Sequence, residues 1–117
     1  EYVDFFFLPP DQTSSTIIQK GVTIEETIEI LQKTYKEFEN LQISKDFNSE
    51  NIEQCLRSLI STINLKPSQT LGTIRSSITG KMVSPPLFET LSILGYSKSL
   101  KRIKHSIQIL SENVEPN

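Results

Sequence analysis

The sequence predicts an all-α fold, a compact bundle or cage of about five short helices. Three observations lead to this prediction: apolar residues recur at helical spacing, capping and turn residues separate these stretches, and no segment alternates polar and apolar residues for long enough to indicate a strand. The length of 117 residues favours one principal domain. We expect it over residues 21–112, between the end of a preceding helical subdomain with its linker (1–20) and a frayed tail (113–117).

The first predicted helix begins at Thr23. Residues 8–15 are expected to form a loop, because they contain paired prolines followed by turn-forming residues. Thr23 and Glu26 have the spacing of a capping box, in which each side chain accepts a backbone N–H at the helix start. The expected apolar stripe comprises Ile24, Ile28, Leu31, Tyr35 and Phe38. A loop over residues 40–48 is expected to follow.

The second predicted helix presents one apolar stripe, formed by Ile52, Cys55, Leu56, Leu59 and Ile63. Cys55 is the only cysteine in the sequence, so no internal disulfide can form, as expected in a reducing compartment. Because Cys55 lies on the apolar stripe, we interpret it as a small core residue rather than a reactive thiol.

The third predicted helix begins at Lys66 and Pro67, because a proline in the first turn lacks only an N–H that would be unpaired anyway. Gly80 predicts its left-handed end. The side expected to be buried carries Leu71, Ile74 and Ile78.

Two more helices complete the prediction. Ser84 is expected as the N-cap of the first, with Pro85 and Pro86 in its first turn and Gly95 at its end. Ser97 is expected to cap the second. Their apolar stripes are Leu87, Phe88, Leu91 and Leu94 in one helix and Leu100, Ile103, Ile107 and Leu110 in the other.

Charge is unevenly distributed along the chain. Residues 1–65 hold five bases against eleven acids, whereas residues 66–117 hold seven bases against three acids. The net charge of −2 argues against general nucleic-acid coating, but the split favours a polyanionic partner for the second half. A solvated basic helix face explains the same pattern equally well. The basic residues of the second half are Lys66, Arg75, Lys81, Lys98, Lys101, Arg102 and Lys104.

Signatures of catalysis, metal binding and membrane insertion are missing from the sequence. The four glycines are scattered rather than gathered in a phosphate-binding loop, and His105 is the only histidine. One histidine and one cysteine do not make an ordinary zinc site. The longest apolar run, residues 5–8, is far shorter than the roughly 20 residues of a membrane-spanning helix. We therefore expect a cytoplasmic, monomeric binding module that has no cofactor and no catalytic residue of its own.

Arg75 is the strongest candidate for recognition in residues 65–95. It follows Ile74 on the third helix and is the only charged residue between Lys66 and Lys81. An arginine held beside a helix N-terminus offers paired donors to a base edge or a phosphate. A local ion pair or a contact with a carbonyl group remains the alternative.

The same stretch resembles the C-terminal anticodon-binding domain of bacterial-type glutamyl-tRNA synthetases. The family pattern reads L-K-x-G, then L-R-x-x-[LV]-T-G, then S-P-x-L-F-E. The corresponding residues here are 65–68, 74–80 and 84–89, and the agreement covers about residues 64–110. Ser68, Thr73 and the pair Ser76-Ser77 depart from the pattern.

The resemblance implies that the chain reads the anticodon stem-loop of tRNA(Glu). It implies further that an upstream class I domain of the parent glutamate–tRNA ligase supplies the chemistry, using ATP and Mg²⁺. The positions that would contact anticodon bases are Gly72, Arg75, Ser84, Pro85 and Leu87. Those that would attract the tRNA backbone are Lys81, Lys98, Lys101, Arg102 and Lys104.

Two other functions remain open on the sequence. Class I lysyl-tRNA synthetases have a similar helical anticodon-binding domain, and a helical protein-interaction domain without RNA binding would have the same secondary structure. Sequence upstream of residue 1 would distinguish the two synthetases.

Overall fold

The computed structural model describes residue 10 and residues 12–80 and 86–114. These residues form six helices and no strand, so the all-α prediction is confirmed for the described part of the chain. The helices are α2 (Ser14–Ile17), α3 (Ile24–Ser44), α4 (Ser49–Ile60), α5 (Pro67–Thr79), α6 (Leu87–Leu94) and α7 (Tyr96–Glu112).

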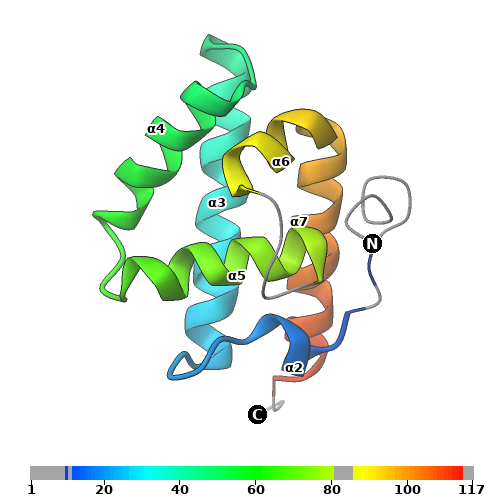
Figure 1. The fold of residues 1–117 in the computed structure, drawn as a ribbon. Helices are drawn as coiled ribbons and strands as arrows, with labels where there is room; N and C mark the ends of the chain where they lie inside the picture. Colours follow the sequence, from blue (N-terminus) through cyan, green and yellow to red (C-terminus); the bar gives the residue numbers. More distant parts are fainter. Residues whose placement is uncertain (1–9, 11, 81–85, 115–117) are drawn as a thin grey trace.

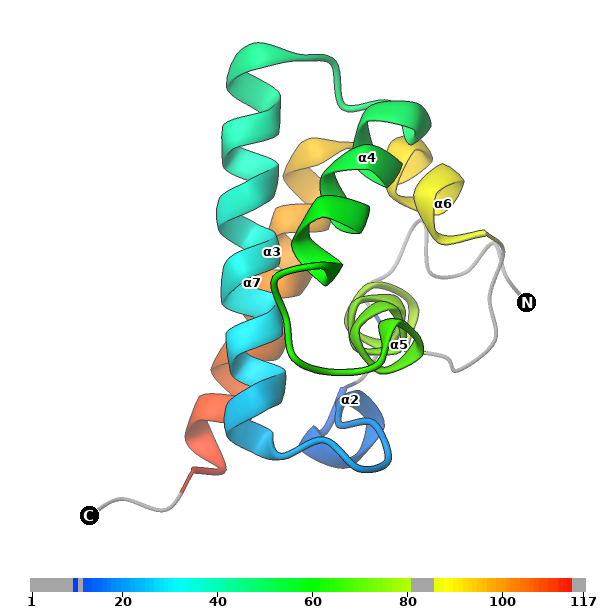
Figure 2. The ribbon, with the colours of Figure 1, turned by 90° about the vertical axis from the view of Figure 1, so that its left-hand side faces the viewer.

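Helix α5 crosses the middle of the domain. Figure 1 shows the two long helices, α3 and α7, running upright behind α5, with α4 on the left and α6 above. Viewed from the side in Figure 2, α5 is seen nearly end-on between α2 below and α4 and α6 above. Helix α5 packs against α2, α3 and α7. It is therefore positioned by segments from both ends of the chain.

The core is apolar and centres on α3. Phe38 is the largest fully buried side chain, and its ring meets Phe47 edge to face at a centroid distance of 5.1 Å. Phe47 meets Tyr96 in the same geometry at 5.8 Å, which links the end of α3 to the start of α7. Such aromatic pairs stabilise a fold beyond the area that they bury.

Capping residues define the start of α3 and both ends of α5, as predicted. Thr23 Oγ1 accepts the Glu26 backbone N–H at 3.0 Å, and Glu26 Oε1 accepts the Thr23 N–H at 2.9 Å. Pro67 occupies the first turn of α5, and Gly80 ends the helix with φ of 72°, a left-handed conformation that favours glycine.

Helix α3 is longer than predicted and buries a different stripe. It continues to Ser44, where residues 40–48 were expected to form a loop. Leu31 and Phe38 are buried as expected. The other members of the predicted stripe are only partly buried: Ile24, Ile28 and Tyr35. The rest of the buried face is formed by Thr27, Ile30, Thr34 and Leu41. Thr34 enters the core without an unpaired hydroxyl, because its Oγ1 donates to the Ile30 carbonyl at 2.7 Å.

Three predicted boundaries are corrected. The expected loop over residues 8–15 contains the start of α2. Helix α6 begins at Leu87 with Pro86 in the extended N-cap position, two residues later than predicted. Helix α7 begins at Tyr96 rather than after Ser97, because Gly95 (φ 88°) ends α6 and its carbonyl accepts the Ser99 N–H at 3.1 Å.

Candidate nucleic-acid interface

Most of α5 is enclosed, and one strip of it faces outward. Its buried residues include five serines and threonines, three of which donate a hydroxyl hydrogen bond back to their own helix. Ser68, Leu71, Gly72 and Arg75 lie three and four residues apart and are partly or fully exposed. The accessible face of α5 therefore presents Gly72 and Arg75 together.

Arg75 has no hydrogen bond or ion pair with any other described residue through its guanidinium group. Its side chain is partly exposed, and its backbone carbonyl accepts the Thr79 hydroxyl at 2.9 Å. Neither the local ion pair nor the carbonyl contact that the sequence left open forms within the described part of the chain. None of the five guanidinium donors is used by a residue that the structure describes.

Gly72 is required by a close approach between α5 and the segment before α3. A Cβ atom at this position would lie 2.7 Å from Gln19 Oε1. Gln19 is buried, and its Nε2 donates to the Ile17 carbonyl and to Ser76 Oγ, both at 3.1 Å. These bonds hold the Gln19 amide in place, so a larger residue at position 72 would fit only if the amide moved and the bonds were broken.

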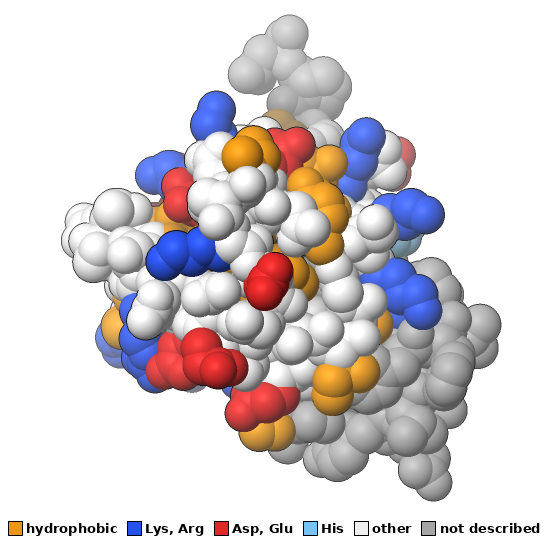
Figure 3. All heavy atoms as spheres, turned by 90° about the horizontal axis from the view of Figure 1, so that it is seen from above, with side chains coloured by type: hydrophobic (Ala, Val, Ile, Leu, Met, Phe, Trp, Pro, Cys, Tyr) orange, Lys and Arg blue, Asp and Glu red, His pale blue; other side chains and the backbone are white. Residues whose placement is uncertain are grey.

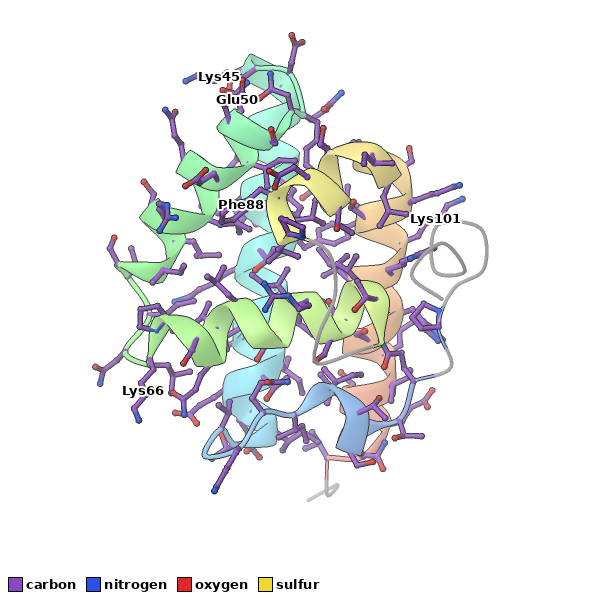
Figure 4. All side chains as sticks on the ribbon, in the orientation of Figure 1. Lys45, Glu50, Lys66, Phe88 and Lys101 are labelled. Atoms are coloured by element: carbon purple, nitrogen blue, oxygen red, sulfur yellow. The ribbon has the colours of Figure 1, made fainter. Side chains whose placement is uncertain are left out.

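Leu87, which the resemblance places among the base-contacting positions, lies mostly inside the domain. Its side chain is only 3% exposed and belongs to the core. The partly exposed apolar side chain of the same turn is Phe88, whose ring lies 5.8 Å from Arg57 Cζ. Figure 4 shows Phe88 at the start of α6, above α5 and on the side toward α4. The sequence assigned both residues to one apolar stripe and gave no indication of the contact with Arg57.

Ser84, Pro85 and Lys81 lie outside the described residues. Pro86, at the N-cap of α6, is exposed. The structure thus brings Gly72 and Arg75 together on α5 and places Phe88 on the adjoining helix.

The basic residues of α7 divide into exposed and buried members. Lys98, Lys101, Lys104 and His105 are exposed. Figure 3 shows basic side chains on both sides of the molecule, and those at the right lie beside a histidine. Lys101 points away from the body of the domain, on the opposite side from Lys66 (Figure 4). Arg102 differs, because it is only 6% exposed and its Nη1 donates to the Ile78 carbonyl at 2.9 Å. It does not share the exposed face on which a phosphate contact was expected.

Helices α3 and α4 have the opposite charge. Together they carry seven acids against three bases, whereas α7 carries four bases against one acid. Two of the bases in the acidic helices are paired within their own helix, Lys33 with Glu29 at 2.9 Å and Arg57 with Glu53 at 2.8 Å. The charge split seen along the sequence therefore separates different helices in space.

Cys55 packs against the core without being fully buried. It lines a hollow of about 330 Å³ between α3 and α4, together with Glu37 and Lys45 among others. Burial and the nearby Glu37 carboxylate raise the pKa of the thiol to about 11. A thiol with so high a pKa is almost fully protonated at neutral pH and is a poor nucleophile.

Within the described ranges, no three histidine, cysteine, aspartate or glutamate side chains gather closely enough to hold a metal ion. The same residues contain no helix that is long and apolar enough to cross a membrane.

Residues 1–107 match the family described as "Anticodon binding domain". The chain belongs to this family.

Several curated relatives that match the chain carry the name glutamate–tRNA ligase. The chain is 35% identical to Glutamate--tRNA ligase 2 of Thermosipho melanesiensis over 104 residues, covering 89% of this chain and 22% of that protein. It is 36% identical to Glutamate--tRNA ligase 2 of Fervidobacterium nodosum over 98 residues, covering 84% and 20%. Identity to Glutamate--tRNA ligase of Roseiflexus castenholzii is 32% over 112 residues, covering 95% and 22%. The chain thus spans about a fifth of the length of these relatives.

Proposed function

We propose that this chain reads the anticodon loop of tRNA(Glu) as part of a glutamate–tRNA ligase. The observation that carries the proposal is the guanidinium of Arg75, which lies on the accessible face of α5 and is unpaired within the described structure. An arginine that no described residue pairs with, in a domain of the anticodon-binding family, can offer its donors to RNA. The glutamate–tRNA ligase relatives favour glutamate over lysine among the two synthetase alternatives.

Arg75 would recognise an unstacked base by its edge. Sequence-specific RNA recognition acts mostly on single-stranded loops, whose bases are splayed out, stacked and hydrogen-bonded on their edges. Arginine presents two parallel N–H donors in a fixed geometry, which suits two acceptors on one base. Gly72, Ser84 and Pro85 complete the proposed base-contacting set, and Phe88 replaces Leu87 as its apolar surface.

The exposed lysines of α7 would attract the tRNA backbone without reading its sequence. Lys98, Lys101 and Lys104 supply positive charge along one side of the domain, and Lys81 is proposed to add to it. The acidic helices α3 and α4 would repel the same backbone. Together the two charged regions orient the domain before any base is contacted.

The catalytic steps are proposed to take place elsewhere in the parent enzyme. Activation of glutamate by ATP with Mg²⁺ would belong to a region outside this chain, which matches only about a fifth of its relatives. We propose that the parent is cytoplasmic and monomeric, with residues 21–112 as the anticodon-binding unit.

Binding to a tRNA(Glu) anticodon stem-loop tests the proposal. We expect each single change of an anticodon base that is read to weaken binding by about 1–3 kcal/mol, or roughly 5- to 150-fold in Kd. Fluorescence anisotropy at one fixed salt concentration measures this difference. A chain that binds all anticodon variants equally, or none of them at low salt, would not be an anticodon reader.

Reversing the charge of Lys101 and Lys104 together is expected to weaken binding of all anticodon variants by the same factor. The plot of log Kd against log salt should also become shallower, because each lost phosphate contact removes about 0.7 from the slope for single-stranded RNA. Lys36→Glu, on the acidic helix α3, is the matched control and should leave the slope unchanged. A changed anticodon preference with an unchanged slope would mean that the α7 lysines contact bases.

A further inference from the structure

Arg102 is a buried cation with a single hydrogen bond to the residues that the structure describes. Its Nη1 donates to the Ile78 carbonyl at 2.9 Å across 24 residues of sequence, and no described carboxylate pairs with it. Burial lowers the pKa of its guanidinium. Removing a charge from water without a counter-ion is costly, so the position of Arg102 needs a compensating role.

The compensation lies at the C-terminal end of α5. The last carbonyls of a helix lack partners within it, and they carry the negative end of the helix dipole. In α5 the Ser76 carbonyl accepts the Gly80 N–H at 2.8 Å, and Gln12 Nε2 donates to the carbonyls of Ser76 and Ser77. Arg102 supplies the donor for the next carbonyl, that of Ile78, together with a positive charge.

This last turn is directly coupled to Arg75. Thr79 is the residue after Ile78, whose carbonyl accepts from Arg102. The Thr79 hydroxyl donates to the Arg75 carbonyl. Gly80 follows with its left-handed backbone and starts the connection that contains Ser84 and Pro85. A shift in the last turn of α5 would therefore act on the part of the helix that carries Arg75.

We propose that Arg102 is a positioning residue for anticodon recognition, which it supports by fixing the C-terminal turn of α5 from within the core. This inference rests on the proposed function of Arg75. Arg102 itself is not in contact with RNA, so its effect falls on the geometry of recognition and not on the electrostatic attraction.

Replacing Arg102 with methionine separates these roles. Arg102→Met keeps the buried volume but leaves the Ile78 carbonyl without its donor. We expect the ratio of Kd values between altered and cognate anticodon stem-loops to fall about tenfold. This factor corresponds to the free-energy cost of leaving one buried polar group without a hydrogen-bond partner. The salt slope should stay unchanged. Arg102→Lys should restore most of the ratio, because an ammonium group also donates and carries the charge.

Lys101→Met is the matched control one residue away. It should lower the salt slope and leave the ratio intact, the reverse of Arg102→Met. A uniform loss of affinity with a lower slope in Arg102→Met would make Arg102 a phosphate contact and overturn the proposal. An intact ratio with a lowered Tm would reduce Arg102 to a stabilising residue and overturn it as well. If Arg102→Met does not fold, Arg102→Leu, which also has no donor, is expected to give the same loss of ratio.

Amide hydrogen exchange in the free chain tests the positioning step without RNA. Exchange of the Thr79 and Gly80 amides should be faster in Arg102→Met than in the original chain, while amides in the middle of α3 stay unchanged. Unchanged exchange at Thr79 and Gly80 would contradict the inference. An original chain without anticodon dependence would instead contradict the proposed function, even if exchange responds as expected.

Discussion

Phe38→Ala is expected to destabilise the domain by about 3–5 kcal/mol, which is a large part of the stability of a domain of this size. The side chain is fully buried in α3 and its ring meets Phe47 edge to face. Removing it opens a cavity and ends a series of aromatic contacts that reaches Tyr96. Urea unfolding followed by circular dichroism measures the change in the free energy of unfolding.

Ile43→Ala is the matched control in the same helix. Ile43 is 84% exposed, so its truncation should change the free energy of unfolding by about 0.5 kcal/mol or less. Comparable effects of the two substitutions would mean that Phe38 is not at the centre of the core.

Arg75→Ala is expected to weaken binding of the cognate anticodon stem-loop by about 1–3 kcal/mol, or roughly 5- to 150-fold. The loss should be confined to the anticodon base that Arg75 contacts, so stem-loops changed at that base should bind the original and the substituted chains alike. Kd values for a series of stem-loops, each with one altered anticodon base, identify that position.

Three further measurements distinguish recognition from structure. Arg75→Lys should recover little affinity, because an ammonium group cannot present two parallel donors. Lys33→Ala, at the exposed ion pair with Glu29, is the control and should leave discrimination unchanged. A thermal melt of Arg75→Ala should match that of the original chain, since no described residue pairs with the guanidinium. A lowered melting temperature with full discrimination would remove Arg75 from the interface.

Sequence patterns predicted those parts of the fold that depend on local chemistry. The capping box of Thr23 and Glu26, the first-turn Pro67 and the left-handed Gly80 each act within a few residues, and all three were placed correctly. The end of α3 was missed because residues 40–44 are polar or exposed apart from Leu41, which a tertiary contact buries. Serines suggested the starts of α6 and α7, but Pro86 and Gly95 occupy those N-cap positions.

The sequence predicted those parts of the candidate interface in which the exposure of a side chain follows from its position around the helix axis. Arg75 lies beside the buried stripe of α5, as its position after Ile74 indicated. Leu87 is buried in agreement with its place on the predicted apolar stripe. Arg102 could not be assigned from helix phase, because its burial depends on which helices pack around α7. Helix α7 contacts α2, α3, α5 and α6, so its buried arc is wide enough to include an arginine that a single apolar stripe would leave in solvent.

The hydroxyl groups of α5 have a consequence for how the helix is held in register. Thr73 and Ser77 donate to carbonyls of their own helix, so these two hydroxyls impose no direction on the helices around them. These groups therefore do not prevent helix α5 from sliding along its axis or turning about it. Three long side chains from distant segments, those of Gln12, Gln19 and Arg102, form hydrogen bonds to α5 that do fix its position along and about its axis. Serine, threonine and alanine should exchange readily at positions 73 and 77 over evolutionary time, whereas Gln12, Gln19 and Arg102 should change only together with the part of α5 to which they are bonded.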